Sequence, residues 1–250
     1  MIIERSMSEE WLSNAYLVAD EPGGHGIVID SGGPSASLIE AIERNDLTVE
    51  HLLLTHHHHD HVAENHVYRD RFGVEILAHP LEAERLLDVD RTIEPSESVV
   101  KVGGLDVAAL HTPGHTAGML SFLVNGSDVF TGDTLFKGSV GGVKAPGSTS
   151  FADLKSSIME RLMALPKDVS VHPGHTDPTT IGDEWERNAF IRLWRGLDEE
   201  GRDRCRVWGD AATLVLWGDD YDGGHKAWVR WEDSGEDDIV PGSQVERDGA

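Results

Sequence analysis

A histidine-rich segment between an apolar run and a helical pattern has the residue types and spacing to bind a divalent metal. It reads Thr55-His56-His57-His58-His59-Asp60-His61. In extended backbone, side chains two residues apart share a face, so His56 and His58 can point toward one metal. Asp60 and His61 would turn toward a neighbouring position as the helix starts. The alternative is a biased polyhistidine tract with no specific geometry.

Three later motifs supply further ligands of the same kind, each directly after a predicted strand. They read Thr112-Pro113-Gly114-His115-Thr116, Thr131-Gly132-Asp133-Thr134 and Pro173-Gly174-His175-Thr176. His115, Asp133 and His175 each stand beside a glycine, whose missing side chain lets the backbone turn tightly and approach a metal closely. These three residues therefore extend the predicted metal site.

The remaining histidines are assigned no ligand role, because a stray histidine is more often structural. They are His25, His51, His66, His79, His111, His172 and His225. His57 and His59 are expected to face the other side of the loop, as supporting or packing residues. Thr55 and Asp30 are candidates for hydrogen bonds that orient the ligands. Because Cys205 is the only cysteine, the chain can form neither an internal disulfide nor a cysteine-based zinc site.

Short β-like runs alternate with helical patterns before about residue 200, which favours a layered α/β fold. The predicted strands are Asn14 to Ala19, Gly26 to Asp30, His51 to Leu54, Val74 to Ala78, Leu105 to Leu110, Met119 to Val124, Asp128 to Phe130 and Val169 to Val171. The predicted helices are Ser35 to Arg44, Val62 to Arg71 closed by Gly73, and a helix capped by Ser150 and Asp153 that runs to about Leu165. The ligand motifs thus lie at strand ends, where α/β proteins place their sites.

The composition and the predicted secondary structure of the chain change beyond about Gly201. Five of the seven tryptophans lie at or after Trp194, and Thr213 to Trp217 with Lys226 to Trp231 predicts a β-hairpin. We therefore predict a main domain over residues 1–200 and a small Trp-rich β appendage with a tail over residues 201–250, the tail being loosely ordered from Asp233. The tryptophans are expected to pack the appendage against the main domain, and a substrate-contacting lid is the alternative.

The composition is strongly acidic, with 45 Asp and Glu against 21 Lys and Arg and a formal net charge of -24. Only six residues are Lys, and the acids are spread along the whole chain. Because salt shortens the reach of charge repulsion, we expect a halophile-like surface, with an acidic partner-binding face as the alternative. The charge argues against a nucleic-acid ligand. With no membrane-spanning run and no secretory leader, the protein is expected to be soluble and cytoplasmic.

The order and local sequence of the ligand motifs resemble the metallo-β-lactamase superfamily from about Asn14 to Arg192. Within it, the chain is most similar to short-form glyoxalase II, the hydroxyacylglutathione hydrolase. The similarity lies in Thr-Pro-Gly-His-Thr-Ala-Gly, Thr-Gly-Asp-Thr-Leu-Phe, and Pro-Gly-His-Thr followed by Thr179-Thr180-Ile181-Gly182 with Glu184 and Asn188. This resemblance implies an αββα sandwich with the site between the upper edges of two sheets. It also implies that His56, His58 and His115 bind one metal, that Asp60, His61 and His175 bind the other, and that Asp133 bridges both.

The resemblance implies hydrolysis of a small-molecule thioester, an S-2-hydroxyacyl thiol. Two divalent metals, zinc in the first place and iron or manganese otherwise, would make hydroxide available at neutral pH and polarise the carbonyl. Asp60 and Asp133 are the expected catalytic carboxylates, with Asp60 orienting the hydroxide as well as binding metal. Neither nucleic acid nor a membrane is expected as a partner, and the oligomeric state is left open.

The chain departs from glyoxalase II where those enzymes carry a basic residue in a Gly-Arg or Gly-Lys step after the bridging aspartate, which holds a carboxylate of glutathione. Here the step reads Gly141-Gly142, with Lys144 two positions on and Lys137 upstream. The Trp-rich appendage also replaces the helical C-terminal extension of the long-form enzymes. A low-molecular-weight thiol other than glutathione is therefore an open alternative as the carrier.

Other functions on a similar scaffold also stay open. An iron-dependent persulfide dioxygenase would bind one iron through His56, His115 and Asp133. Those enzymes tend to have Ala-His where this chain has Gly174-His175, and Gly-Asp-Ala where it has Gly132-Asp133-Thr134. A lactonase, a phosphodiesterase or nuclease, and a non-catalytic metal-binding module are the further alternatives.

Overall fold

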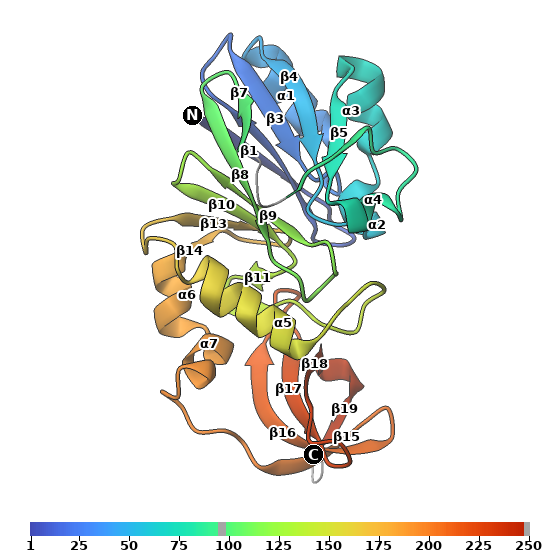
Figure 1. The fold of residues 1–250 in the computed structure, drawn as a ribbon, viewed down its shortest axis with the longest axis vertical. Coiled ribbons are helices and arrows are strands. Elements are labelled where there is room, and N and C mark those ends of the chain that lie inside the picture. Colours follow the sequence, from blue (N-terminus) through green and yellow to red (C-terminus); the bar gives the residue numbers. More distant parts are fainter. Residues whose placement is uncertain (95–98, 248–250) are drawn as a thin grey trace.

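The computed structural model describes residues 1–94 and 99–247, and its first half builds a six-stranded sheet covered by helices (Figure 1). The strands follow chain order across the sheet: β1 (Ile2–Met7), β2 (Asn14–Ala19), β3 (His25–Ile29), β4 (Thr48–Leu53), β5 (Glu75–Ala78) and β6 (Arg91–Thr92). The helices are α1 (Ser35–Arg44), α2 (His59–Val62), α3 (Asn65–Phe72) and α4 (Pro80–Ala83). From β3 to β6 the strands pair in parallel, as βα connections require.

The second sheet has the order β14-β13-β10-β9-β8-β7. Its strands are β7 (Val99–Val102), β8 (Leu105–His111), β9 (Leu120–Val124), β10 (Asp128–Gly132), β13 (Ser170–Pro173) and β14 (Thr179–Thr180). The small hairpin of β11 (Leu135–Phe136) and β12 (Ser139–Val140) follows β10. The helices of this half are α5 (Phe151–Ser156), which continues as the π-helix η1 (Ser157–Leu162), α6 (Ile181–Arg187) and α7 (Ala189–Trp194).

Three apolar clusters show how the layers stack. The central cluster joins the facing sides of the two sheets, for example Val18 and Leu53 with Val107 and Phe122. A second cluster packs α1 and α3 on the outer face of the first sheet, and a third packs α5, η1, α6 and α7 on the outer face of the second sheet. The order of layers is therefore helix, sheet, sheet, helix, which confirms the predicted αββα sandwich.

The C-terminal residues form a separate five-stranded antiparallel sheet (Figure 1). Its order is β18-β17-β16-β15-β19, from β15 (Asp203–Val207), β16 (Asp210–Asp219), β17 (His225–Trp231), β18 (Asp237–Pro241) and β19 (Val245–Arg247), with a 3-10 turn η2 (Gly242–Gln244) before β19. The predicted hairpin is β16 and β17. Trp228 joins the apolar cluster of α5 to α7, which agrees with the packing role expected for the tryptophans. The division at residue 200 stays a prediction.

The predicted loose tail from Asp233 is wrong. Within it, β18 pairs with β17 over five residues, and β19 pairs with β15. The indole N–H of Trp231 also donates to the Asp238 carboxylate at 3.0 Å. The segment is ordered because β18 pairs with its neighbour in the chain, β17, and because β19 pairs with the distant strand β15. Pairing with a distant strand leaves no local pattern in the sequence.

The predicted helix Val62 to Arg71 corresponds to α3, which begins three residues later at Asn65, whereas Val62 ends the short helix α2. The backbone N–H of Glu64 donates to the carbonyl oxygen of Ser31 at 3.2 Å, and so leaves the helical hydrogen-bond ladder. Gly73 ends α3 with a φ of 68°, as predicted. The Ser150 cap is also confirmed, since its hydroxyl accepts the N–H of Asp153 at 3.1 Å.

Candidate metal centre

The ligand motifs meet at one edge of the sandwich because each follows a strand that ends there. The histidine-rich loop follows β4, and the motif of His115 follows β8. Strands β10 and β13 are parallel neighbours with Gly132 opposite Pro173, so Asp133 and His175 leave the sheet side by side. Residues far apart in the chain are thus brought together by strand pairing.

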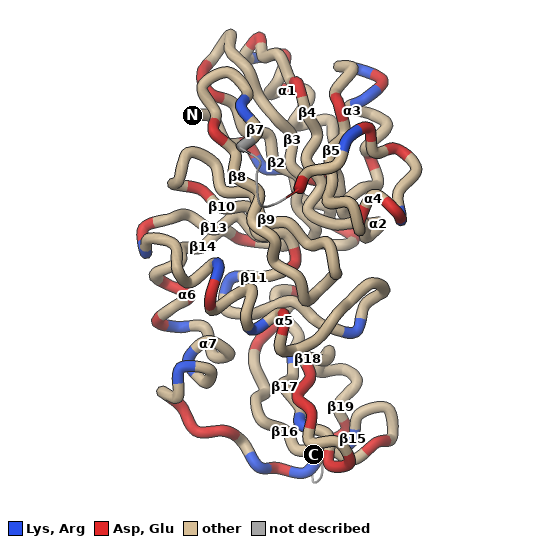
Figure 2. The backbone as a smooth tube through the Cα atoms, viewed as in Figure 1, with Lys and Arg blue, Asp and Glu red and all other residues tan. Residues whose placement is uncertain are grey.

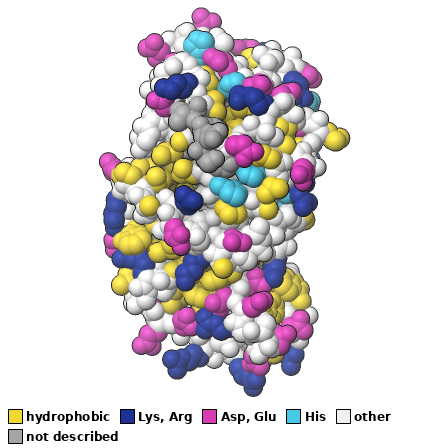
Figure 3. Space-filling view, in the orientation of Figure 1, with side chains coloured by type: hydrophobic (Ala, Val, Ile, Leu, Met, Phe, Trp, Pro, Cys, Tyr) yellow, Lys and Arg dark blue, Asp and Glu magenta, His cyan; other side chains and the backbone are white. Residues whose placement is uncertain are grey.

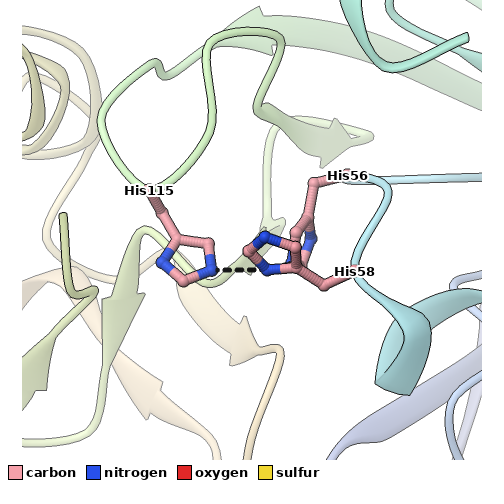
Figure 4. Close-up of side chains that lie close together, drawn as sticks. All are labelled: His56, His58 and His115. Atoms are coloured by element: carbon pink, nitrogen blue, oxygen red, sulfur yellow. Dashed lines mark hydrogen bonds between the residues drawn. The ribbon is translucent and has the colours of Figure 1, made fainter. Parts of the chain in front are cut away.

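One group of ligand atoms belongs to His56, His58 and His115, and these atoms lie within 4.8 Å of one another. Figure 4 shows the three rings converging from the loops after β4 and β8. His58 Nδ1 lies 3.1 Å from His56 Nε2 and 3.0 Å from His115 Nε2. Three ring nitrogens turned toward a common point fit a bound cation.

A second group belongs to Asp60, His61 and His175, again with ligand atoms within 4.8 Å of one another. The two Nε2 atoms of His61 and His175 are 3.4 Å apart. Each lies 3.5 Å from Asp60 Oδ2. Side chains of both histidines are buried, whereas the Asp60 side chain keeps 28% of its surface exposed, so Asp60 stands at the solvent side of the centre.

Asp133 touches both groups. Its Oδ2 lies 3.5 Å from His115 Nε2 and 3.3 Å from His175 Nε2, and its Oδ1 lies 3.3 Å from His61 Nε2. The Oδ1 atom is buried and accepts no hydrogen bond from the residues that the structure describes. A buried carboxylate oxygen in that state needs an opposite charge, and this donor set fits two divalent cations with Asp133 between them.

Hydrogen bonds to backbone carbonyl oxygens determine which ring nitrogen of three of these histidines faces the centre. Nδ1 of His115 donates to the Gly142 carbonyl at 2.8 Å, and Nδ1 of His175 donates to the Trp11 carbonyl at 3.0 Å. His58 is turned the other way, with Nε2 donating to the Pro146 carbonyl at 2.9 Å. The nitrogen that faces the centre is then left unprotonated, as a metal ligand must be.

The expected supporting roles of Asp30 and Thr55 are confirmed by their contacts. Asp30 accepts hydrogen bonds from the N–H and the hydroxyl of Thr55, both at 2.8 Å, and its Oδ2 lies 3.0 Å from His61 Nδ1. The Thr55 hydroxyl also lies 3.0 Å from His56 Nδ1. Asp30 has a left-handed φ of 54°, a conformation that costs energy for a residue with a side chain. That strained turn aims its carboxylate at the ring of His61.

Burial and neighbouring charges shift the pKa values of the centre in opposite directions. Burial lowers the pKa of His115 to about 4. Burial alone would raise the pKa of Asp133, but the neighbouring His175 and His61 hold it well below the usual range. Burial would likewise lower the pKa of His61, but Asp133 and Asp30 raise it. The carboxylate is thus anionic, and burial also lowers the pKa of His56 and His58. Asp133 and the three rings of the first group therefore favour the protonation states that metal binding uses.

Gly174 is required by close packing at the centre. A Cβ atom there would lie 2.3 Å from Asp133 Oδ1 and 2.9 Å from His61 Cε1. Both atoms belong to the centre, so no side chain fits at this position. The predicted close approach of backbone beside the ligands is therefore present here.

The histidines predicted to have other roles lie outside the two groups described above. His57 turns away and pairs with Glu82, and His59 packs its ring edge against Trp11. Several of the other histidines pair with carboxylates or with one another, for example His172 with Asp128 and His79 with His111.

Sequence reasoning missed one residue beside the centre. Tyr221, between β16 and β17, stacks on the ring of His175 with centroids 4.3 Å apart and ring planes at 16°. Burial and then Asp133 raise the pKa of Tyr221 above its ordinary value, which places the phenol within electrostatic reach of that carboxylate. No motif or spacing pointed to this tyrosine, because its contact with the centre arises only from docking of the C-terminal sheet.

Within the described ranges, no helix is long and apolar enough to cross a membrane.

Comparison with known proteins identifies the same superfamily that the ligand motifs resemble. The family model described as the metallo-beta-lactamase superfamily matches residues 9–175. The hydroxyacylglutathione hydrolase GloC of Haemophilus influenzae is 35% identical over 197 residues, which cover 71% of this chain and 92% of that protein.

Similar solved structures cover the sandwich as well. The BLEG-1 B3 metallo-beta-lactamase has a TM-score of 0.70 and 27% identity, over 76% of this chain and 99% of that one. ETHE1 from Myxococcus xanthus has a TM-score of 0.66 and 26% identity, over 79% and 92%. TTHA1623 in a di-iron-bound form has a TM-score of 0.61 and 31% identity, over 74% and 98%. With the sandwich and the histidine and aspartate groups, these matches show that the chain belongs to the metallo-β-lactamase superfamily.

Proposed function

We propose that the protein is a binuclear metallohydrolase that cleaves the thioester of an S-2-hydroxyacyl thiol. One observation carries the proposal: both ligand groups are complete, and Asp133 contacts each of them. The second converging set of Asp60, His61 and His175 favours a second metal beside the first. The similarity to a hydroxyacylglutathione hydrolase supports the acyl class.

The ligand roles in this proposal are those that the family resemblance implied. His56, His58 and His115 hold one metal, Asp60, His61 and His175 hold the other, and Asp133 lies between them. Two divalent cations so held lower the pKa of bound water and polarise a carbonyl. Zinc suits the nitrogen-rich ligand set, while iron or manganese would also fit, and a related structure is described as di-iron-bound.

The chain's own residues supply orientation. Asp60 is the one partly exposed carboxylate of the centre, so it faces an entering substrate and can accept a hydrogen bond from the attacking water. Asp133 is buried and contacts histidines of both groups. A thiolate leaving group is stable in water, so cleavage needs no separate proton donor. The substrate is a small molecule, with neither nucleic acid nor a membrane involved.

The glutathione carrier is expected to bind weakly, because nearby lysines are already paired. Lys144 forms an ion pair with Asp238 of the C-terminal sheet. Lys137 lies 3.7 Å from the carboxylate of Asp177. Gly142 has no side chain to offer. A carboxylate of glutathione would therefore compete with Asp238 or Asp177, and a smaller or differently charged thiol ester should be turned over faster.

An iron-dependent persulfide dioxygenase is the second candidate, because His56, His115 and Asp133 alone could hold one iron. A lactonase on the same fold would use both metals. The two reaction classes differ in what they consume, since hydrolysis requires no oxygen whereas a dioxygenase must take it up.

The test begins with elemental analysis of the purified protein, for which we expect two metals per chain. The zinc-loaded protein should then release free thiol from S-lactoyl thioesters without oxygen, and more slowly from the glutathione ester than from the ester of a smaller thiol. The iron-loaded protein with a persulfide is the comparison. Oxygen uptake there, with a single tightly bound iron and no thiol release from any thioester, would overturn the proposal in favour of the dioxygenase.

A further inference from the structure

The loop of residues 220–224, between β16 and β17, brings the C-terminal sheet to the metal centre. Tyr221 stacks on His175 as described, and its ring also lies against Phe136 with centroids 4.8 Å apart. His175 is a proposed ligand and Phe136 lies in β11, next to the motif of Asp133. One wall beside the centre is therefore built from a residue outside the αββα sandwich.

Polar contacts hold this loop in place. Asp220 accepts a hydrogen bond from the Ser139 hydroxyl at 3.0 Å and pairs with Lys226 at 3.1 Å. The ammonium of Lys226 is buried and also donates to the Val140 carbonyl at 2.9 Å. It lies 5.3 Å from the ring centroid of Tyr221. A buried ion pair with a backbone partner is a costly arrangement to break, so Tyr221 has a defined position.

The hydroxyl of Tyr221 has no hydrogen-bond partner among the residues that the structure describes, although the ring is packed on two sides. The side chain is half-buried. A phenol O–H can both donate and accept, so a hydroxyl that the protein leaves unpaired can bond to water or to a ligand that displaces the water. The donor is thus available beside the ring of His175.

The loop also lies outside the part of the chain that the superfamily model matches, which ends at residue 175. The related structures described above cover 74% to 79% of the chain. The C-terminal sheet is therefore an addition that can alter specificity without changing the ligand motifs.

We propose that Tyr221 is a substrate-contacting residue, whose O–H donates a hydrogen bond to an oxygen of the acyl group while its ring keeps His175 in position. The identity of the acyl group rests on the proposed function, whereas the contact itself does not. The C-terminal sheet then has a part in substrate selection as well as in packing.

Two substitutions separate the hydroxyl from the ring. Tyr221→Phe keeps the stack on His175 and removes the donor. We expect two metals per chain as before, an unchanged melting temperature, and a loss in kcat/KM of about 10- to 100-fold, the size of one hydrogen bond to the negative charge that develops on an acyl oxygen in the transition state. Tyr221→Leu removes the stack too, and we expect it to retain less metal on dialysis. Tyr68→Phe is the matched control, because Tyr68 lies in α3, is buried against the first sheet, and its hydroxyl has no hydrogen-bond partner there.

A binding measurement keeps the proposal testable if no thioester is turned over. D-lactate, a 2-hydroxycarboxylate, is titrated calorimetrically into the zinc-loaded wild type, Tyr221→Phe and Tyr68→Phe. An affinity about tenfold lower for Tyr221→Phe alone supports the contact even where hydrolysis fails. If the wild type cleaves a thioester, the comparison of kcat/KM between wild type and Tyr221→Phe decides whether the proposal holds. Equal kcat/KM in wild type and Tyr221→Phe, or in the absence of turnover equal or undetectable lactate binding, overturns the proposal.

Discussion

Asp133 is the residue on which the two halves of the metal centre depend. Its two oxygens reach histidines of both groups, and one of these oxygens has no satisfied hydrogen bond. A carboxylate placed between two cations offsets part of their repulsion, which a neutral amide of the same shape does not.

Asp133→Asn should therefore lose at least one metal per chain and most turnover. We expect activity to fall by more than the ~10- to 100-fold that residues supporting a ligand contribute. Elemental analysis and thioester kinetics measure both effects. Asp128→Asn, at the start of the strand β10 that leads to Asp133, is the control, since Asp128 pairs with His172 away from the centre. Full metal occupancy with full turnover in Asp133→Asn would show that Asp133 is not the bridge.

At the scale of elements, Glu82 in α4 ties the histidine-rich loop to the loop that follows His115. Its carboxylate accepts the N–H of His57 at 3.0 Å and the N–H of Gly118 at 2.8 Å, and it pairs with the His57 ring. Burial alone would raise the pKa of Glu82, but the hydrogen bonds from His57, Thr116 and Gly118 hold it below the usual value. One buried charge thus connects two ligand-bearing loops.

Because the pKa of Glu82 is lower in the folded state, ionised Glu82 stabilises the fold at pH values above its pKa in the unfolded chain, about 4.3. This stabilisation is lost as the pH falls through the pKa of Glu82 in the folded state. At pH 7, Glu82→Gln should lower the free energy of unfolding of the metal-free protein by about 3 kcal/mol. The difference from wild type should shrink below about pH 4. Urea unfolding across this range tests both statements, with the exposed Glu84→Gln as control. A pH-independent difference would contradict the role assigned to the charge.

At the scale of the whole molecule, the acidic excess is distributed over the fold. Figure 2 shows Asp and Glu along the whole chain, and on the face in Figure 3 they are dispersed and interleaved with Lys and Arg. With a formal net charge of -24 the folded chain repels itself over long distances. At 1 M salt the screening length is about 3 Å, so that repulsion is largely removed.

The fold and activity are accordingly predicted to require high salt. If screening contributes about 3 kcal/mol, the melting temperature of a chain of this size should rise by roughly 6 to 12 °C between dilute buffer and molar potassium chloride. Thermal unfolding of the metal-loaded protein measures the shift, and turnover should rise over the same range. A melting temperature that stays flat or falls would contradict the prediction.

Local sequence was sufficient to predict a layered α/β fold and to select the candidate ligands, whereas the αββα sandwich was implied by the resemblance to the superfamily. Strand β2 and helix α1 have the predicted bounds, and His115, Asp133 and His175 each follow a strand and stand beside a glycine, since these signals depend on neighbouring residues only. That the ligands bind two metals stays a prediction for elemental analysis. Only the tertiary structure decided that β19 pairs with β15, that Lys144 is neutralised by Asp238, and that Tyr221 lies on His175. These are contacts between segments distant in the chain, and periodicity and spacing carry no record of them.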